Sequence, residues 1–230
     1  MRIQIIDKKN KKRINAGDPL TKQPTIKKET AAGESPMEPP SSYAPSTVEQ
    51  VDIKDMSALL KELIKEHNQA KNALNKFEKT LHKLKEEKWK INQETNKELS
   101  EFFHFFDHQI MAHNRKEEKT LFPLLHEKLL ANGEHATDHK QTAIDLMEDD
   151  HVLFIQLGTL TFNLIGIASR LSEEKDKNIV FEMAYQNGLE LIESLRLHIF
   201  REDETLFPLA HQLINKKEFE HLLELSQKLN

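Results

Sequence analysis

Apolar and polar residues recur with a helical period from about Asp55 to the end of the chain. Apolar positions three and four residues apart mark the buried face of an amphipathic helix, and strand-like alternation is nearly absent. The pattern predicts helices at about 55–92, 96–131, 140–171, 178–214 and 218–228, with a break near Trp89. Asn132–Gly133 is a helix-stop signal that ends the second helix. We therefore expect an all-α, up-down four-helix bundle over residues 55–230, with a short C-terminal helix.

The first 50 residues lack this pattern. Six of the eight prolines in the chain precede residue 46, and large apolar residues are few after Ile6. A segment of this composition cannot bury enough apolar surface to offset the entropy lost on ordering. We expect residues 1–50 to be a Pro-, Lys- and Ser-rich N-terminal tail, disordered over about 8–50.

Composition excludes several classes of function. The 230 residues include no Cys, which excludes disulfides, thiolate metal sites and a cysteine nucleophile, and no glycine-rich phosphate-binding loop is present. The formal net charge is −5, and the tail has nine Lys and Arg against six Asp and Glu, too small an excess to predict nucleic-acid binding. No run reaches the roughly 18 apolar residues of a membrane span, and the N-terminus does not resemble a signal peptide. A cytoplasmic protein without a nucleic-acid or membrane partner is expected.

The chain contains an internal repeat. The segment from His113 to Leu124 matches the segment from His198 to Leu209, an offset of 85 residues (198 − 113). Leu63–His67 matches Met147–His151 at an offset of 84 (151 − 67). The two helix pairs are thus predicted to be versions of one unit, related by an internal two-fold repeat. Both longer segments contain Leu-Phe-Pro, whose proline is expected to kink or restart the helix.

Each of the four long helices directs one histidine toward the predicted bundle axis. On a helical wheel of about 100° per residue, these histidines fall within the apolar stripe of their helices. The second and fourth helices add a glutamate one turn later, on the same face. Because a buried carboxylate is costly unless it is paired or bound to a metal, these residues are predicted to ligate metal ions. The six candidates are His67, His113, Glu117, His151, His198 and Glu202.

Four imidazoles and two carboxylates suit two metal ions, each with two imidazoles, bridged by the carboxylates. Such ligands favour iron or manganese, with zinc as the usual competitor. Glu118 and Asp203 directly follow the chosen glutamates, but they point about 140° away from the histidine of their own helix. Glu101–His104 and Glu148–His151 both have the Glu-x-x-His spacing of ferritin-like sites, but Glu101 and His104 fall on the solvent face. A metal-free structural bundle is the remaining alternative, and two carboxylates in the core argue against it.

The third helix carries a second apolar ridge, roughly opposite His151 on the wheel. It consists of Leu153, Leu157, Leu160 and Leu164. We expect the C-terminal helix to cover this ridge, because the chain itself supplies that helix. A homodimer or another protein docking on the ridge is the alternative, and the N-terminal tail is a second candidate for docking a protein partner.

The six residues and their order resemble the hemerythrin-like (HHE cation-binding) family. The resemblance covers about residues 55–214: a lone His on the first helix, His-x-x-x-Glu before Leu-Phe-Pro on the second, a lone His on the third, and the same motif on the fourth. It implies a non-haem di-iron centre in which the histidines are terminal ligands. The glutamates would bridge the irons, with an oxo or hydroxo group between them. The resemblance also implies handling of O2, NO or peroxide in the bundle core, by binding, stress response or redox chemistry.

The pattern also departs from that of the oxygen-carrying hemerythrins. Those proteins place a second His one turn after the His of the third helix, where this chain has Ile155, and they end with His-x-x-x-x-Asp in place of His-x-x-x-Glu. The departure argues against simple reversible O2 carriage. The ligand set is more similar to that of bacterial stress-response di-iron proteins. An iron- or oxygen-responsive sensor without turnover is the alternative function, and no catalytic residue is predicted.

Overall fold

The computed structural model describes residues 51–134 and 141–229, so the predicted tail at 1–50 lies outside the described residues. All regular structure in the described ranges is helical, which confirms the all-α class. The helices are α1 (Ala58–Glu86), α2 (Gln93–Phe105), η3 (Phe106–Ile110), α3 (Met111–Lys119), α4 (Leu121–Ala131), α5 (Ala143–Ala168), α6 (Glu174–Arg201), η4 (Glu202–Leu206), α7 (Phe207–Leu213) and α8 (Lys216–Gln227). Both η3 and η4 are single π-helical turns. We call the four long helical segments of the bundle rods: the first is α1, the second runs from α2 to α4, the third is α5, and the fourth runs from α6 to α7.

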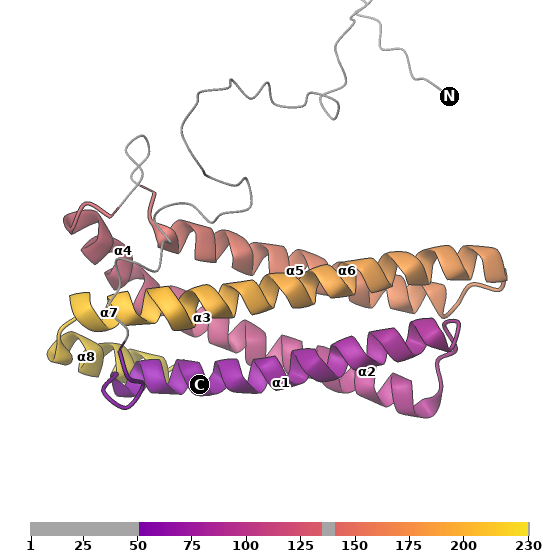
Figure 1. Ribbon diagram of the computed structural model, residues 1–230, viewed down its shortest axis with the longest axis horizontal. Helices are drawn as coiled ribbons and strands as arrows, with labels where there is room; N and C mark the ends of the chain where they lie inside the picture. Colours follow the sequence, from indigo (N-terminus) through magenta and orange to yellow (C-terminus); the bar gives the residue numbers. More distant parts are fainter. Residues whose placement is uncertain (1–50, 135–140, 230) are drawn as a thin grey trace, which may run out of the picture. The chain divides into compact units, whose positions relative to one another are not determined.

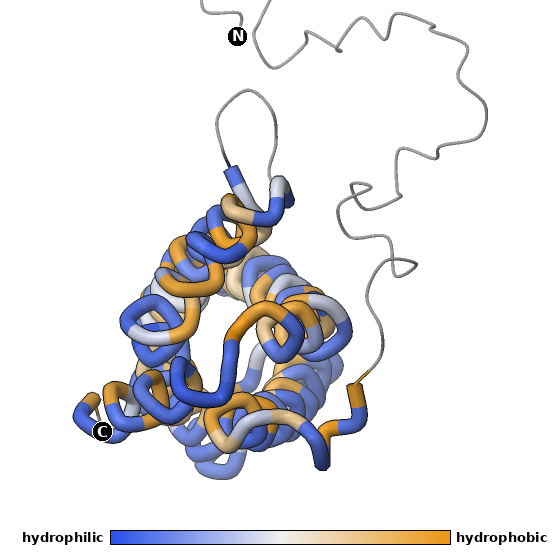
Figure 2. The backbone as a smooth tube through the Cα atoms, turned by 90° about the vertical axis from the view of Figure 1, so that its left-hand side faces the viewer, coloured by the Kyte–Doolittle hydropathy of each residue, from blue (hydrophilic) through white to orange (hydrophobic). Residues whose placement is uncertain are grey.

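The long helices lie side by side (Figure 1), and seen end-on they surround a common axis (Figure 2). α5 packs along α6, and α1 packs against both α2 and α6. Two apolar clusters fill the interior. One includes Phe77 and Phe154, and the other includes Leu60, Phe122 and Phe207. The predicted metal ligands lie along the rods at the junction between these clusters.

The helix ends follow local signals. α1 ends at Glu86, and the left-handed φ angles of Lys88 (52°) and Trp89 (61°) confirm the predicted break near Trp89. The Trp89 ring stacks on Phe181 at 5.6 Å, a contact that offsets the cost of the left-handed backbone. The predicted stop after the second rod is also found: α4 ends at Ala131, and Gly133 follows with φ of 78°. Glycine adopts this conformation without steric cost.

The prediction that each Leu-Phe-Pro segment kinks or restarts its helix is confirmed for the first segment only. α3 ends at Lys119, and Thr120 leaves helical geometry with φ −126° and ψ −76° before α4 begins. In the other half the rod stays continuous through the π turn η4, and Pro208 lies in the first turn of α7. The N–H groups of a first turn have no partner within the helix, so proline costs little at such a position.

α8 does not cover the leucine ridge of α5, which corrects the sequence-based expectation. α8 packs on α1 instead, where Phe219 and Leu222 join the cluster of Leu60 and Phe122. The connection between α7 and α8 is short, so α8 stays near the start of α1. Three ridge residues are covered by the bundle itself: Leu157 and Leu164 are buried, Leu153 is half-buried, and Leu160 is 44 % exposed.

Among the described helices, α5 is long and apolar enough to cross a membrane by length and composition alone. Core helices of soluble proteins share this property. α5 buries His151, Phe154 and Leu157 inside the bundle. Packing within the bundle covers 39 % of its apolar 18-residue stretch.

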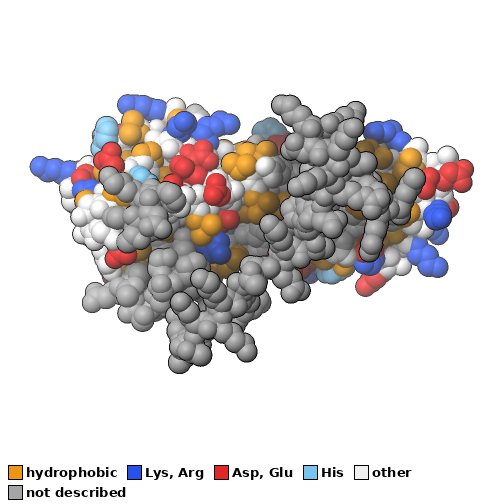
Figure 3. Space-filling model, turned by 90° about the horizontal axis from the view of Figure 1, so that it is seen from above, with side chains coloured by type: hydrophobic (Ala, Val, Ile, Leu, Met, Phe, Trp, Pro, Cys, Tyr) orange, Lys and Arg blue, Asp and Glu red, His pale blue; other side chains and the backbone are white. Residues whose placement is uncertain are grey.

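The outer face of α5 keeps some apolar side chains at the surface. Ile155 is 49 % exposed, so it lies outside the core although it is one turn after the buried His151. The face of α5 that points into the bundle is centred on Phe154 and Gly158. Ile155 therefore lies on the outer face, with the exposed Val152. Where side chains are visible from above in Figure 3, hydrophobic groups lie in separate patches between charged ones.

Gly158 lets α5 approach the second rod closely. A Cβ atom at this position would lie 2.6 Å from the ring of the buried Phe106. We expect Gly158→Ala to lower the free energy of unfolding by about 1–3 kcal/mol, because overpacking outweighs the gain in helix propensity. The control is Gly166→Ala on the same helix, where the nearest atom is the end of the Arg170 side chain at 3.7 Å. That change should stabilise by up to about 1 kcal/mol in urea unfolding. A Gly158→Ala protein as stable as the Gly166→Ala protein would contradict this packing.

Candidate metal centre

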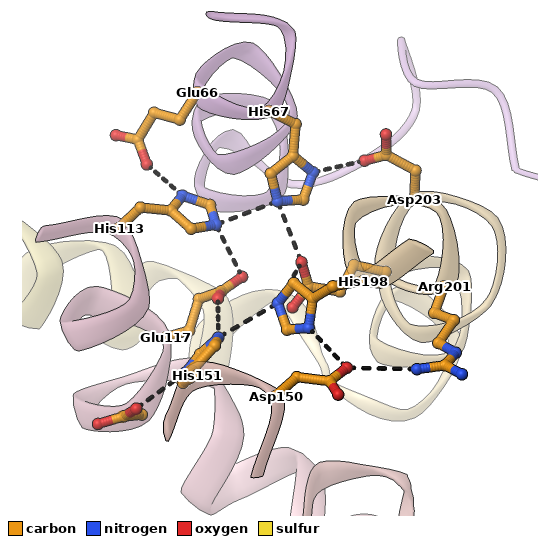
Figure 4. A network of polar contacts seen from close by, with 11 residues as sticks. Glu66, His67, His113, Glu117, Asp150, His151, His198, Arg201 and Asp203 are labelled. Atoms are coloured by element: carbon orange, nitrogen blue, oxygen red, sulfur yellow. Dashed lines mark hydrogen bonds and ion pairs between the residues drawn. The ribbon is translucent and has the colours of Figure 1, made fainter. Parts of the chain in front are cut away.

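The six predicted ligands converge at the junction of the two apolar clusters. Figure 4 shows the four histidines and Glu117 directed toward one another. Every long rod contributes one histidine, and the two rods with Leu-Phe-Pro each add a glutamate. The elements and residues are α1 with His67, α3 with His113 and Glu117, α5 with His151, α6 with His198, and η4 with Glu202. Their side chains are at most 10 % exposed, and His113 is the most exposed of them. The structure thus brings all six candidates together.

The histidines form two pairs with their Nε2 atoms facing each other. The Nε2 atoms of His67 and His113 lie 3.0 Å apart, and those of His151 and His198 lie 3.2 Å apart. Two nitrogen ligands about 2.1 Å from one ion and 90° apart are separated by about 3.0 Å. The spacing of each pair therefore fits two neighbouring ligands of a common metal ion.

Each glutamate lies between the two histidine pairs. Glu117 places Oε1 3.4 Å from Nε2 of His113 and Oε2 3.6 Å from Nε2 of His151. Glu202 places Oε2 3.1 Å and 3.3 Å from Nε2 of the histidines on α1 and α6. Both glutamates consequently belong to both four-residue groups that can hold a cation. This is the position from which a carboxylate bridges two ions.

A carboxylate faces the outer nitrogen of every histidine. The Nδ1 pairs are His67 with Asp203 (2.7 Å), His113 with Glu66 (2.7 Å), His151 with Glu118 (2.8 Å) and His198 with Asp150 (3.2 Å). An ionised carboxylate only accepts hydrogen bonds, so each Nδ1–H donates outward and holds its ring in place. In the neutral imidazole the lone pair of Nε2 then points into the site, as metal ligation requires.

The charges of the site also call for a cation. Burial disfavours a charge on His113, but the Glu117 carboxylate beside it outweighs burial and raises the pKa of His113 to about 10. Burial alone would raise the pKa of Glu202, but the charges on the neighbouring His198 and His67 lower it. The oxygens of both glutamates lie within ion-pair range of Nε2 atoms, yet none has a partner with hydrogen-bond geometry. This geometry fits a cation between these groups better than shared protons.

We call the four carboxylates that face the Nδ1 atoms the outer carboxylates. Three of them form ion pairs with basic side chains. Asp203 pairs with Lys71 at 2.7 Å, and Glu66 pairs with Lys116. Asp150 pairs with Arg201 at 3.3 Å (Figure 4). Burial would raise the pKa of Asp203 and of Glu66, but hydrogen bonds from a histidine and a lysine lower the pKa of both. Asp203 and Glu66 are therefore kept ionised, as acceptors for the Nδ1–H groups.

The outer carboxylates are the functional residues that the sequence reasoning missed. Glu118 and Asp203 do point away from the histidine of their own helix, as predicted, but each reaches a histidine of another rod. Glu66 and Asp150 were not singled out. A signal was present, because each of the four is adjacent in sequence to a predicted ligand. They also follow the repeat, at offsets of 84 (150 − 66) and 85 (203 − 118).

Aromatic rings close the site on the side of α4 and α7. Phe207 stacks on His67 at 5.3 Å, and Phe122 stacks on His151 at 5.6 Å. On the opposite side of the site, the Phe154 ring packs edge-on against His198 at 5.0 Å. These three rings are fully buried, so they keep water away from the ligands.

A small cavity of about 20 Å³ adjoins the ligands. Three of the histidines line it, and His151 does not. The lining also includes the apolar side chains of Ala70, Ile110, Leu195 and Ile199. A cavity of this volume has room for about one water molecule or a diatomic molecule.

The remaining described histidines lie outside the site. His104 and His108 are exposed with Glu101 on the face of α2 and η3, so the ferritin-like alternative is not realised. Nδ1 of His126 lies 2.9 Å from the hydroxyl of Thr142 at the start of α5. The histidines at 135 and 139 are outside the described residues.

Comparison with known proteins agrees with this geometry. The family model of the hemerythrin HHE cation binding domain matches residues 58–210, which contain all six converging residues. Searches of curated proteins and of solved structures returned no match. Domains of the matched family bind metal cations, usually iron, and the buried His and Glu groups fit such a site. The chain belongs to the hemerythrin HHE cation-binding domain family.

Proposed function

We propose that this protein is a non-haem di-iron protein that handles a small oxidising or diatomic molecule, O2, NO or peroxide, in the core of its bundle. One iron would be held by His67 and His113 and the other by His151 and His198. Glu117 and Glu202 would bridge them, together with an oxo or hydroxo group. The observation that carries the proposal is the position of both glutamates between two histidine pairs whose Nε2 atoms are 3.0 and 3.2 Å apart.

Iron bound by imidazoles and carboxylates supplies redox and Lewis-acid chemistry toward small oxygen- and nitrogen-containing molecules. The residues of the chain prepare the site for this chemistry. The outer carboxylates orient the histidines, and the buried phenylalanines exclude water. The cavity of about 20 Å³ is too small for an organic substrate, which favours a ligand of two or three atoms.

We further infer that the two helix pairs are versions of one unit. The outer carboxylates and the phenylalanines stacked on His67 and His151 follow the same offsets as the ligands. A duplicated unit that supplies half of each ligand group accounts for this agreement.

Native purified protein is expected to contain about two irons per chain, with near-ultraviolet charge-transfer absorption. The absorption should bleach with dithionite and return in air, because reduction removes the transition from the bridging group to ferric iron. Metal analysis and ultraviolet–visible spectroscopy on the same sample provide the test. Zinc as the bound metal, or a spectrum that no small oxidant changes, would contradict the proposal.

A sensor without turnover is the second candidate. Glu202 is both a predicted ligand and the first residue of η4, and α7 and α8 follow directly. Metal loss at Glu202 would therefore act on the end of the bundle where these helices pack. The metal-dependent stability considered in the Discussion tests this candidate.

A further inference from the structure

The exposed apolar side chains of the protein gather on one pair of helices. Eleven large apolar side chains are exposed among the described residues, and nine of them lie on α5 or α6. These two helices lie side by side (Figure 1). α5 carries five of the nine: Val152, Ile155, Leu160, Phe162 and Ile167. Single exposed apolar residues are common on soluble proteins, but their concentration on adjoining helices marks an interaction surface.

α5 also lacks charge over most of its length. From Val152 to Ser169 the chain contains no Asp, Glu, Lys, Arg or His. Exposed polar residues within this run include Gln156, Thr159 and Asn163, and they are uncharged. Packing within the bundle covers only 39 % of the apolar stretch of this helix. Because charged residues are depleted at the centre of protein interfaces, the uncovered face of α5 has the composition of such a centre.

Phe162 is an ordered anchor on this face. Its side chain is 58 % exposed, yet the ring also packs edge-on against Phe103 of α2, with 5.0 Å between the ring centroids. A ring that is already held by a buried neighbour loses little side-chain entropy when a partner binds. Aromatic side chains are prominent among the residues that dominate the binding energy of an interface.

The charged residues at the two ends of the uncharged run have opposite signs. Glu148 and Asp149 precede the run and Arg170 follows it, and all three side chains are exposed. Thr159 lies midway, eleven residues after Glu148 and eleven before Arg170. In an antiparallel pair of α5 helices with a two-fold axis beside Thr159, Arg170 of each copy meets the acidic pair of the other copy. A parallel pair would instead bring like charges together.

We propose that α5 is the centre of an antiparallel, two-fold interface between two copies of this chain, flanked by the exposed apolar residues of α6. The face of α5 and these adjoining side chains offer on the order of 800 Å², which is what each partner contributes to a stable interface. An uncharged centre with opposite charges at its ends is complementary to itself, so the partner that fits it is a second copy. The inference uses no residue of the metal centre and is independent of the proposed function.

The first test measures the mass of the full chain by analytical ultracentrifugation over a series of concentrations. The natural chain should sediment at twice its mass of 26.8 kDa. Ile155→Glu and Phe162→Glu each introduce two charges into the centre of the dimer, one from each copy, and should raise its dissociation constant at least about a hundredfold. The matched control is Ile53→Glu. Ile53 is 52 % exposed, close to the 49 % of Ile155, but it lies outside α5 and α6, so the dissociation constant should not change.

An exchange of charges tests the antiparallel orientation separately. Arg170→Glu should weaken self-association, and so should the double variant Glu148→Arg with Asp149→Arg, because like charges then meet at both ends of the interface. A mixture of these two proteins should form a heterodimer with about the natural affinity, since opposite charges meet again at both ends. All three residues are exposed, so the changes leave the core intact. Circular dichroism and melting temperature verify the fold of every variant.

A natural chain that is monomeric at about 100 μM would overturn the proposal. Sedimentation of that monomer with phosphatidylcholine vesicles would then assign the apolar face of α5 to a lipid surface. A dimer that persists unchanged in Ile155→Glu and Phe162→Glu would overturn it as well, because another face would hold the copies together. If the mixed charge variants form no heterodimer, the antiparallel arrangement is wrong.

Discussion

A Glu202→Ala protein is expected to lose both metal ions, whereas a His67→Ala protein should retain about one. Glu202 belongs to both ligand groups, so its removal takes a charged ligand from each ion. His67 belongs to only one group, and the other group keeps all four of its residues. We expect about two irons per natural chain, fewer than about 0.5 in Glu202→Ala and about one in His67→Ala.

The measurement is metal content after purification at the same iron supply, together with circular dichroism to verify that each variant is helical. Glu118→Ala is the matched control for the glutamate change. Glu118 also faces a histidine, but it contacts the outer nitrogen of His151 and not its Nε2 atom. It should lower iron affinity by about 10–100-fold without abolishing binding, as is typical of groups that orient a ligand. Equal iron loss in His67→Ala and Glu202→Ala would show that the two groups do not bind separately.

Removal of the metal is expected to lower the melting temperature by about 10 °C. A ligand present at about a thousand times its dissociation constant stabilises the folded state by about 4 kcal/mol. In a domain of this size, each kcal/mol corresponds to about 2–4 °C. The metal-free protein also keeps two buried glutamates whose oxygens have no hydrogen-bond partner. Thermal melts of the chelator-treated protein, before and after iron is restored, provide the measurement.

The control is the double variant Glu117→Gln with Glu202→Gln. It removes the buried charges and the bridging ligands together, so its melting temperature should not respond to iron. Its metal-free form should melt at or above the temperature of the metal-free natural chain. Limited proteolysis at α7 and α8 should follow the same pattern if the protein acts as a sensor. Identical melting curves and cleavage with and without metal would contradict both the structural role of the metal and the sensor candidate.

Helical periodicity was sufficient to identify the six converging residues. The direction of a side chain around its own helix depends on 100° steps, which any local sequence reveals. His113 and Glu117 are four residues apart on one apolar face, and so are His198 and Glu202. The repeat then showed that both halves carry the same arrangement. The helix ends near Trp89 and Gly133 could also be predicted from the sequence, because each depends on a few neighbouring residues.

The contacts between rods could not be predicted from helical periodicity. Asp203 points away from the histidine of its own helix, yet it accepts a hydrogen bond from His67 on α1. Whether it does so depends on the rotation and spacing of α1 relative to the rod of α6 and η4. The packing of α8 on α1 and the exposure of Ile155 depend on the same variables. A single helical wheel contains no information on them.

The sequence by itself therefore determined the all-helical class, the six converging residues and the family resemblance, because these follow from spacing within single helices and from their repetition. Only the tertiary structure decided which carboxylates orient the histidines, where the last helix packs, and that a cavity lies beside Ala70. These features arise between helices, where small differences in approach determine whether two side chains touch or leave room for a ligand.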